Sequence, residues 1–126
     1  MTRYNPTRSL SLVLPWPPSV NRIWRAVAGR VVLSESARKY AVTCANALPT
    51  GPVDPLRGRL QVVMTLQAPA ALANRCYDIA NREKHVFDVL TRQRVWVDDS
   101  QIDGLMILRG TPQGAGAAIL DITELP

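Results

Sequence analysis

A strict alternation of side-chain character in the middle of the chain limits the fold more than any other sequence feature. The apolar residues are Leu60, Val62, Met64 and Leu66, and they alternate with Gln61, Val63, Thr65 and Gln67. A two-residue repeat places each set on its own face of a β-strand, so that one face can be buried. The segment therefore predicts a central strand, around which the rest of the chain must be arranged.

Further strands and a helix are predicted on both sides of this segment. Leu10, Leu12 and Leu14 alternate along Ser9–Leu14, and the prolines that follow end this strand because proline cannot donate to a β-ladder. Residues 22–33 predict a hairpin that turns near Gly29, and residues 105–108 and 117–125 predict two more strands. Ser34 is the expected N-cap of a helix, whose buried stripe comprises Ala37, Tyr40, Ala41, Cys44 and Leu48.

The whole chain, residues 1–126, is expected to form one domain. It has 47% hydrophobic residues and no internal repeat or linker, and it is long enough to bury a core without covalent cross-links. Cys44 and Cys76 lack metal-ligand spacing and are expected to be free thiols in a reducing compartment. No apolar run approaches the ~20 residues that span a bilayer, and the N-terminus has no signal-peptide pattern. We therefore expect a soluble, cytoplasmic protein.

Acidic residues are concentrated in one stretch of an otherwise basic chain. The net charge is +5, yet the stretch from Arg75 to Asp103 holds six of the ten acidic residues: Asp78, Glu83, Asp88, Asp98, Asp99 and Asp103. Carboxylates can hold a divalent cation, and surrounding arginines can hold phosphates. This distribution favours a metal-dependent enzyme that acts on a polyanion.

Within this stretch the spacing predicts a helix over Asp78–Thr91, followed by a turn that carries Asp98 and Asp99. Ile79, Val86 and Leu90 recur at helical spacing, and the sector with Asp78, Lys84 and His85 is polar. Carboxylates from the helix start and from the turn could converge on one Mg²⁺, which needs only one or two of them. The alternative is an ordinary amphipathic helix followed by a solvated, aspartate-rich turn.

Arginine predominates among the basic residues, with 15 Lys and Arg in total. The planar guanidinium matches two phosphate oxygens at once, although a GC-rich genome would also favour arginine. Arginines interleaved with Trp24 on the predicted hairpin suit a nucleic-acid backbone, and a solvated hairpin face is the alternative. Our candidates for DNA contacts are Arg22, Arg25, Arg30, Arg75 and Arg82. Trp16 is either a base-stacking surface or an anchored core aromatic.

These motifs, in this order, resemble the RusA family of Holliday-junction resolvases along nearly the whole chain. The matching segments are LPWPPSVNRIWR from Leu14, the Ser34-led helix, the strand before the acidic stretch, DIAN with Lys84, FDVLT and VWVDDSQI. The resemblance implies an α/β fold of the α+β type, with a small mixed sheet and two main helices packed on it. It also implies a homodimeric, Mg²⁺-dependent endonuclease, in which Mn²⁺ may substitute, that makes paired nicks in four-way branched DNA.

Carried over residue by residue, the resemblance assigns Asp78 and Asp99 to two of the family's catalytic aspartates and Lys84 to its essential lysine. The family's remaining aspartate belongs two residues after the first, where this chain has Ala80. Glu83 lies three residues beyond Ala80, and on a helix it could reach back and deliver its carboxylate to the ion. Asp98 is an auxiliary candidate ligand. The alternatives are a catalytically impaired protein that binds junctions on the same scaffold, or a small basic domain that binds RNA or a protein.

Overall fold

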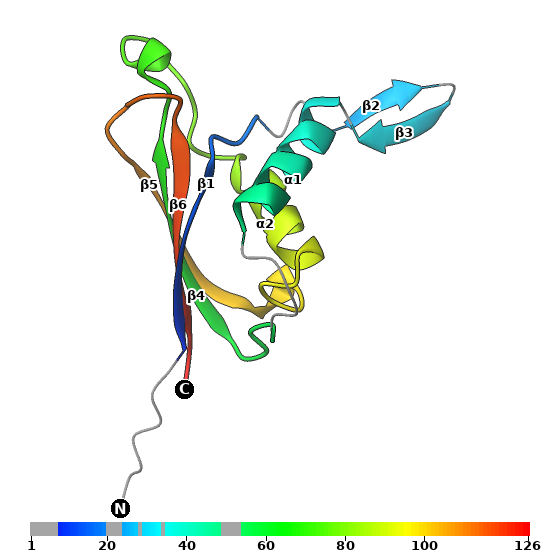
Figure 1. The fold of residues 1–126 in the computed structure, drawn as a ribbon, viewed down its shortest axis with the longest axis vertical. Helices are drawn as coiled ribbons and strands as arrows, with labels where there is room; N and C mark the ends of the chain where they lie inside the picture. The colour runs from blue at the N-terminus through cyan, green and yellow to red at the C-terminus, as the bar shows by residue number, and fades with distance from the viewer. Residues whose placement is uncertain (1–7, 20–23, 28, 34, 49–53) are drawn as a thin grey trace, which may run out of the picture.

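A computed structural model describes residues 8–19, 24–27, 29–33, 35–48 and 54–126, and the statements below refer to these residues. Its main sheet has four strands in the order β1-β6-β4-β5. These are β1 (Ser9–Pro15), β6 (Ala117–Glu124), β4 (Leu60–Gln67) and β5 (Ile102–Arg109). The helices α1 (Glu35–Ala47) and α2 (Glu83–Arg92) both lie on one side of this sheet (Figure 1). The predicted α+β class, with a mixed sheet and two helices, is confirmed.

The connection between β4 and β5 places the acidic stretch over the sheet. β6 pairs antiparallel with both β1 and β4, whereas β4 and β5 are parallel. A parallel pair cannot be closed by a tight turn and needs a crossover, which here includes the short 3₁₀ helix η2 (Ala70–Leu72), α2 and a second 3₁₀ helix, η3 (Asp99–Gln101). One end of the acidic stretch therefore precedes α2, and the other reaches the first residues of β5.

The core forms between the apolar face of the sheet and the two helices. The predicted alternation in β4 is confirmed, since its four apolar members are each 0% exposed: Leu60, Val62, Met64 and Leu66. Tyr40 and Cys44 of α1 and Val86 and Leu90 of α2 belong to the same buried cluster. Trp96, 0% exposed, packs edge-to-face on Phe87 and donates to Thr91 Oγ1 at 2.7 Å. The core thus fixes the start of the segment that joins α2 to β5.

The predicted hairpin is confirmed as the strands β2 (Trp24–Val27) and β3 (Arg30–Leu33), which project from the end of the molecule near α1 (Figure 1). Gly29 has φ = 76°, a left-handed conformation that glycine adopts without strain. Ser34, the predicted N-cap of α1, lies outside the described residues. Both cysteines are free, as expected; Cys44 is buried and Cys76 is exposed. In the described part of the chain, no helix is long and apolar enough to cross a membrane.

The predicted helix over Asp78–Thr91 is wrong at its start, because α2 begins only at Glu83. Asn81 has φ = 65°, which an α-helix cannot contain and which asparagine tolerates better than most residues. Ala80 therefore lies in a turn and is not a helical neighbour of Glu83. His85, expected on the polar face, is instead buried at 4% exposure.

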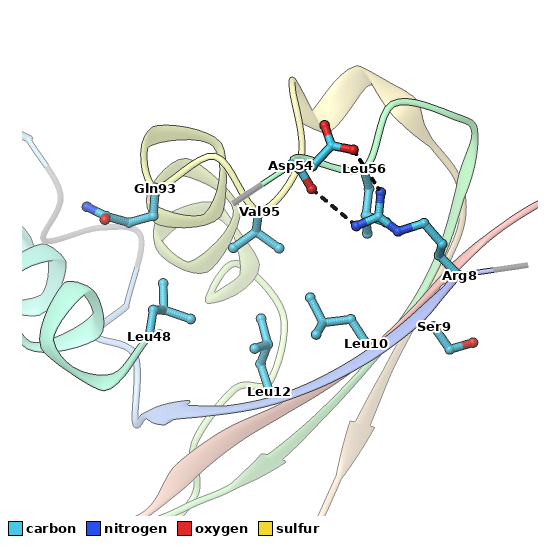
Figure 2. A pocket seen from close by; sticks show the side chains of 9 residues that line it. All are labelled: Arg8, Ser9, Leu10, Leu12, Leu48, Asp54, Leu56, Gln93 and Val95. Atoms are coloured by element: carbon cyan, nitrogen blue, oxygen red, sulfur yellow. Dashed lines mark hydrogen bonds and ion pairs between the residues drawn. The ribbon is translucent and has the colours of Figure 1, made fainter. Parts of the chain in front are cut away.

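A pocket interrupts the packing between β1 and the end of α2 (Figure 2). It is lined by Leu10, Leu12, Leu48, Leu56 and Val95 together with Ser9, Gln93 and an ion pair. In that pair Arg8 Nη2 donates to the Asp54 carbonyl at 3.1 Å, and Nη1 lies 3.8 Å from Asp54 Oδ2. None of the predicted site residues lines this pocket.

The burial of His85 predicts a pH dependence of stability. Its ring lies edge-to-face on Tyr40, Nε2 is 3.3 Å from the Ser19 carbonyl oxygen, and burial lowers the pKa of the imidazole. As pH falls through the ordinary histidine pKa of about 6.5, the unfolded chain gains a proton that the folded chain resists, so folding is weakened. Urea unfolding at about pH 7.5 and about pH 5.5 should show a larger loss of stability for the native chain than for His85→Gln. Equal losses in the two chains would contradict this account.

Candidate active site

The turn before β5 and the start of α2 are joined through Lys84. Its ammonium nitrogen Nζ lies 3.3 Å from Asp88 Oδ1, one turn along α2, and 4.0 Å from Asp99 Oδ2. The structure therefore brings together two of the predicted site residues, Lys84 and Asp99, which are fifteen positions apart in the sequence. An ammonium beside a carboxylate can neutralise charge on a phosphate that approaches both groups.

The Asp99 turn is held by the buried side chain of Gln101. The amide oxygen Oε1 accepts from the backbone N–H groups of Val97 and Asp98, each at 2.8 Å. The amide nitrogen Nε2 donates to the carbonyls of Leu56 at 3.0 Å and Gly58 at 2.8 Å. Sequence reasoning missed Gln101, although the D-x-x-Q spacing from Asp98 to Gln101 is that of a capping box. Its amide fixes where the Asp99 carboxylate can lie.

Asp98 has a structural role in the same turn. It is the N-cap of η3, and its Oδ2 accepts from the Ser100 N–H at 3.0 Å. These hydrogen bonds from Ser100 hold the pKa of the Asp98 carboxyl below its usual value. Metal binding by Asp98, predicted as an auxiliary ligand, would therefore have to compete with this capping interaction. In the described residues, by contrast, no hydrogen bond engages the Asp99 carboxylate.

The loop that carries Asp78 is anchored by Arg82. Arg82 Nε donates to the Asp78 carbonyl at 2.7 Å, and Nη1 donates to the Pro17 carbonyl at 2.8 Å. The guanidinium carbon lies 4.6 Å from the centre of the Trp16 ring, a cation–π contact. Arg82, predicted to contact DNA, thus already has intramolecular partners, and partial burial lowers its pKa.

Two further residues extend this contact into a stacked series. Trp16 packs edge-to-face on Tyr77, with 5.8 Å between ring centres, and Arg109 lies 4.4 Å from the centre of the Tyr77 ring. Arg109 Nη2 also donates to the Tyr77 carbonyl at 3.2 Å. Trp16 is half-buried and packs against the core, so the structure supports the anchored aromatic. The series, Arg82–Trp16–Tyr77–Arg109, ties the residue before Asp78 to the end of β5.

Arg75 is exposed and lines a shallow hollow with Cys76, Tyr77, Asp78 and Arg109. Two arginines, Arg75 and Arg109, therefore line the same hollow as Asp78, an arrangement that suits a phosphate backbone. Arg109 was missed by sequence reasoning, because only the fold brings β5 beside this loop. Of the other predicted DNA contacts, Arg25 and Arg30 lie on β2 and β3, and Arg22 lies outside the described residues.

Glu83 carries a buried acidic oxygen without a hydrogen-bond partner among the described residues, namely Oε2. Burial of a carboxylate oxygen is costly unless a donor or a cation satisfies it. In the described part of the chain, no three His, Cys, Asp or Glu side chains come close enough together to hold a metal ion by themselves. The residues present therefore do not fit a closed protein cage, but they fit a sparse Mg²⁺ site that relies on one or two carboxylates, water and substrate phosphate.

Comparison with known proteins now decides the family. The family model described as "Endodeoxyribonuclease RusA" matches residues 15–119. This chain belongs to the RusA family. The proteins named crossover junction endodeoxyribonuclease RusA from Escherichia coli (strain K12) and from Enterobacteria phage 82 are 30% and 29% identical to it. The two alignments cover 91% and 90% of this chain and 94% and 93% of these RusA relatives. The matched range includes every segment that forms the candidate site.

The side-chain amide of Gln101 makes four hydrogen bonds, so even a nearly isosteric substitution should strongly reduce stability. Gln101→Glu keeps an acceptor for Val97 and Asp98 but loses both donors and places a carboxylate against two carbonyl oxygens. We expect it to lower the free energy of unfolding by roughly 1–3 kcal/mol, the usual cost of a buried polar group without its partner. Gln61→Glu, at an exposed position of β4, is the matched control and should change it by less than about 0.5 kcal/mol. Equal effects in urea unfolding would refute the role given to Gln101.

Proposed function

We propose that this chain is an endonuclease that resolves four-way DNA junctions by paired, symmetric nicks in DNA recombination and repair. The observation that carries the proposal is the match, along nine-tenths of the chain, to relatives named crossover junction endodeoxyribonucleases. The contact between Lys84 and Asp99 supports it, because both were expected in the catalytic site from motif positions alone. The basic balance of the chain, with a net charge of +5, suits a polyanionic substrate.

In this proposal Asp78 and Asp99 are the principal ligands of Mg²⁺, for which Mn²⁺ may substitute. Such an ion, when bound, activates water and stabilises the leaving oxygen of a phosphodiester. Lys84 neutralises charge on the scissile phosphate from its place beside Asp99, while Arg75 and Arg109 hold the backbone next to Asp78. Asp98 keeps the turn in shape and is at most an auxiliary ligand.

Glu83 is proposed to supply the carboxylate that Ala80 lacks. The expected helical i,i+3 relation between these two residues does not exist, because Ala80 precedes α2. Glu83 is the first residue of α2, adjacent to Lys84, and its Oε2 is a buried acceptor that a cation could satisfy.

Two copies of the chain are proposed to act together. A four-way junction has two-fold symmetry, and paired nicks require two equivalent sites, which a two-fold dimer provides. A second candidate function, junction binding without cleavage, is favoured by Ala80 in place of an acidic residue and by the lack of a three-carboxylate cluster among the described residues.

A synthetic four-way junction with one labelled strand at a time separates the candidate functions. With Mg²⁺ or Mn²⁺, the resolvase should produce nicks at symmetry-related positions in two opposed strands, and EDTA should abolish them. Tight binding of the junction without nicks in either ion would favour the binding protein. Equal affinity for linear duplex and for the junction would contradict both.

Glu83→Gln tests whether Glu83 supplies the carboxylate that Ala80 lacks. It removes the charge at nearly constant volume, and we expect the nicking rate to fall by roughly 100-fold or more, beyond the 10–100-fold typical of residues that only support a ligand. Junction affinity measured in EDTA should stay within about 3-fold of that of the native chain, which corresponds to a change in binding free energy of under about 0.7 kcal/mol. Glu35→Gln, at an exposed position of α1, is the control and should nick like the native chain. Native rates in Glu83→Gln would rule out the role of Glu83.

A further inference from the structure

The segment that carries Asp78 has no backbone support of its own. In the described part of the chain, residues 76–78 belong to no helix or strand and take part in no backbone–backbone hydrogen bond. A loop without such bonds opens at little cost in free energy, and a site needs its groups held within about 0.5 Å of the productive geometry. The Asp78 carboxylate can therefore bind an ion in a defined place only if side chains hold this loop.

Two arginine side chains supply this support by donating to successive carbonyl groups. Arg109 Nη2 donates to the Tyr77 carbonyl at 3.2 Å, and Arg82 Nε donates to the Asp78 carbonyl at 2.7 Å. Hydrogen bonds from a charged donor are stronger than those between neutral groups. The bond from Arg82 is the shorter of the two, and it acts on Asp78 itself.

The other end of the Arg82 guanidinium is anchored to the segment that follows β1. Its Nη1 donates to the carbonyl of Pro17, a buried residue, at 2.8 Å. Tyr40 of α1, 6% exposed, donates through its hydroxyl to the nearby Pro15 carbonyl at 2.8 Å. Arg82 therefore connects the Asp78 backbone to a segment that the core holds in place.

We propose that Arg82 is a positioning residue for the metal site: through the Asp78 carbonyl it holds the Asp78 carboxylate where that group binds the cation. The inference rests on the proposed function, in which Asp78 is a principal ligand of Mg²⁺. Residues that orient a ligand contribute about 10–100-fold to metal affinity. The position of each carboxylate matters here, because no cluster of three possible ligands exists among the described residues.

A phosphate contact, the role that the sequence predicted for Arg82, does not suit this geometry. Two of the three guanidinium nitrogens already donate to carbonyl oxygens, and the half-buried side chain stacks on the Trp16 ring. A phosphate that took these donors would release the loop and the carboxylate with it. Arg75, by contrast, is exposed and remains the candidate for the phosphate contact.

Titration of the full chain with Mn²⁺ tests the positioning role without DNA, because the EPR signal of the free ion reports how much remains unbound. Arg82→Met removes both hydrogen bonds at similar side-chain length, and we expect the dissociation constant for Mn²⁺ to rise by about 10-fold or more. The direction of the change is decisive. Removal of a positive charge beside Asp78 would by itself strengthen the binding of a cation, so a charge effect alone predicts the opposite result.

Two further variants separate geometry from charge. Arg82→Lys keeps the charge but replaces the planar fork by a single nitrogen, so it should also weaken Mn²⁺ binding, and it carries the test if Arg82→Met does not fold. Arg92→Met, at an exposed position in the last turn of α2, should leave the dissociation constant unchanged. Circular dichroism checks that each variant is folded. Native Mn²⁺ affinity in the folded Arg82 variants, or no Mn²⁺ binding by the native chain, would overturn the proposal.

Junction binding in EDTA separates positioning from a phosphate contact. Loss of one phosphate contact makes the dependence of log affinity on log salt concentration less steep by about one. Arg82→Met should keep the native slope, whereas Arg75→Met should reduce its steepness by about one. A reduced steepness in Arg82→Met would identify Arg82 as a phosphate contact and would overturn the proposal.

These measurements are separate from the test of the function. Weaker Mn²⁺ binding by Arg82→Met, in a protein whose native chain does not nick junctions, would support the role of Arg82 and refute the resolvase. Paired nicks by the native chain, together with unchanged Mn²⁺ affinity in Arg82→Met, would refute the role of Arg82 and leave the resolvase intact.

Discussion

The amide of Gln101 makes four hydrogen bonds to backbone groups from two distant segments, and much of the site geometry depends on it. Its nitrogen satisfies carbonyls of the segment that leads into β4, and its oxygen satisfies N–H groups of the turn that leads into β5. Because β4 and β5 are parallel neighbours, both strands start at the same end of the sheet. The Gln101 amide therefore joins the segments that lead into β4 and β5. The Asp99 carboxylate belongs to the turn that this amide holds in place.

Several of the acidic residues in the stretch from Arg75 to Asp103 have structural partners. Asp103 accepts from Arg59 Nε at 3.0 Å, Asp88 pairs with Lys84, and Asp98 caps η3. Asp78, Glu83 and Asp99 remain; of these, Asp99 lies 4.0 Å from the Lys84 ammonium that also pairs with Asp88. The negative charge in this stretch thus falls into two groups: about half of it holds the crossover in place, and the other half comprises the residues that are proposed to act in catalysis. A count of charges cannot distinguish these two groups, because the distinction depends on which cations the fold brings near.

The sequence predicted the elements well where a repeat of two or about 3.6 residues reports burial on one face, as in β4 and α1. It failed at the start of α2, because helix propensity and apolar spacing do not reveal that the Asn81 backbone is left-handed. The sequence motif predicted that Lys84 belongs to the candidate site. Its contact with Asp99 could not be predicted in this way, because that contact depends on the crossover between β4 and β5. Tyr77 and Arg109 were missed for the same reason, since their stacking depends on a loop and a strand end that meet only in three dimensions. Gln101 could have been found from its capping spacing.

The length of α2 constrains the relative positions of the residues before and after it in the crossover. Asp78 lies before this ten-residue helix and Asp99 lies after it, so the helix length affects how these two candidate residues are placed relative to each other. One added residue would lengthen the helix by about 1.5 Å and rotate everything beyond it by about 100°. Lys84 would then lose its alignment with the Asp99 turn, or the apolar stripe of α2 would leave the core. The β2–β3 hairpin projects away from the sheet and carries no such constraint. Variation in chain length is therefore expected to concentrate there, while the number of residues in α2 stays fixed.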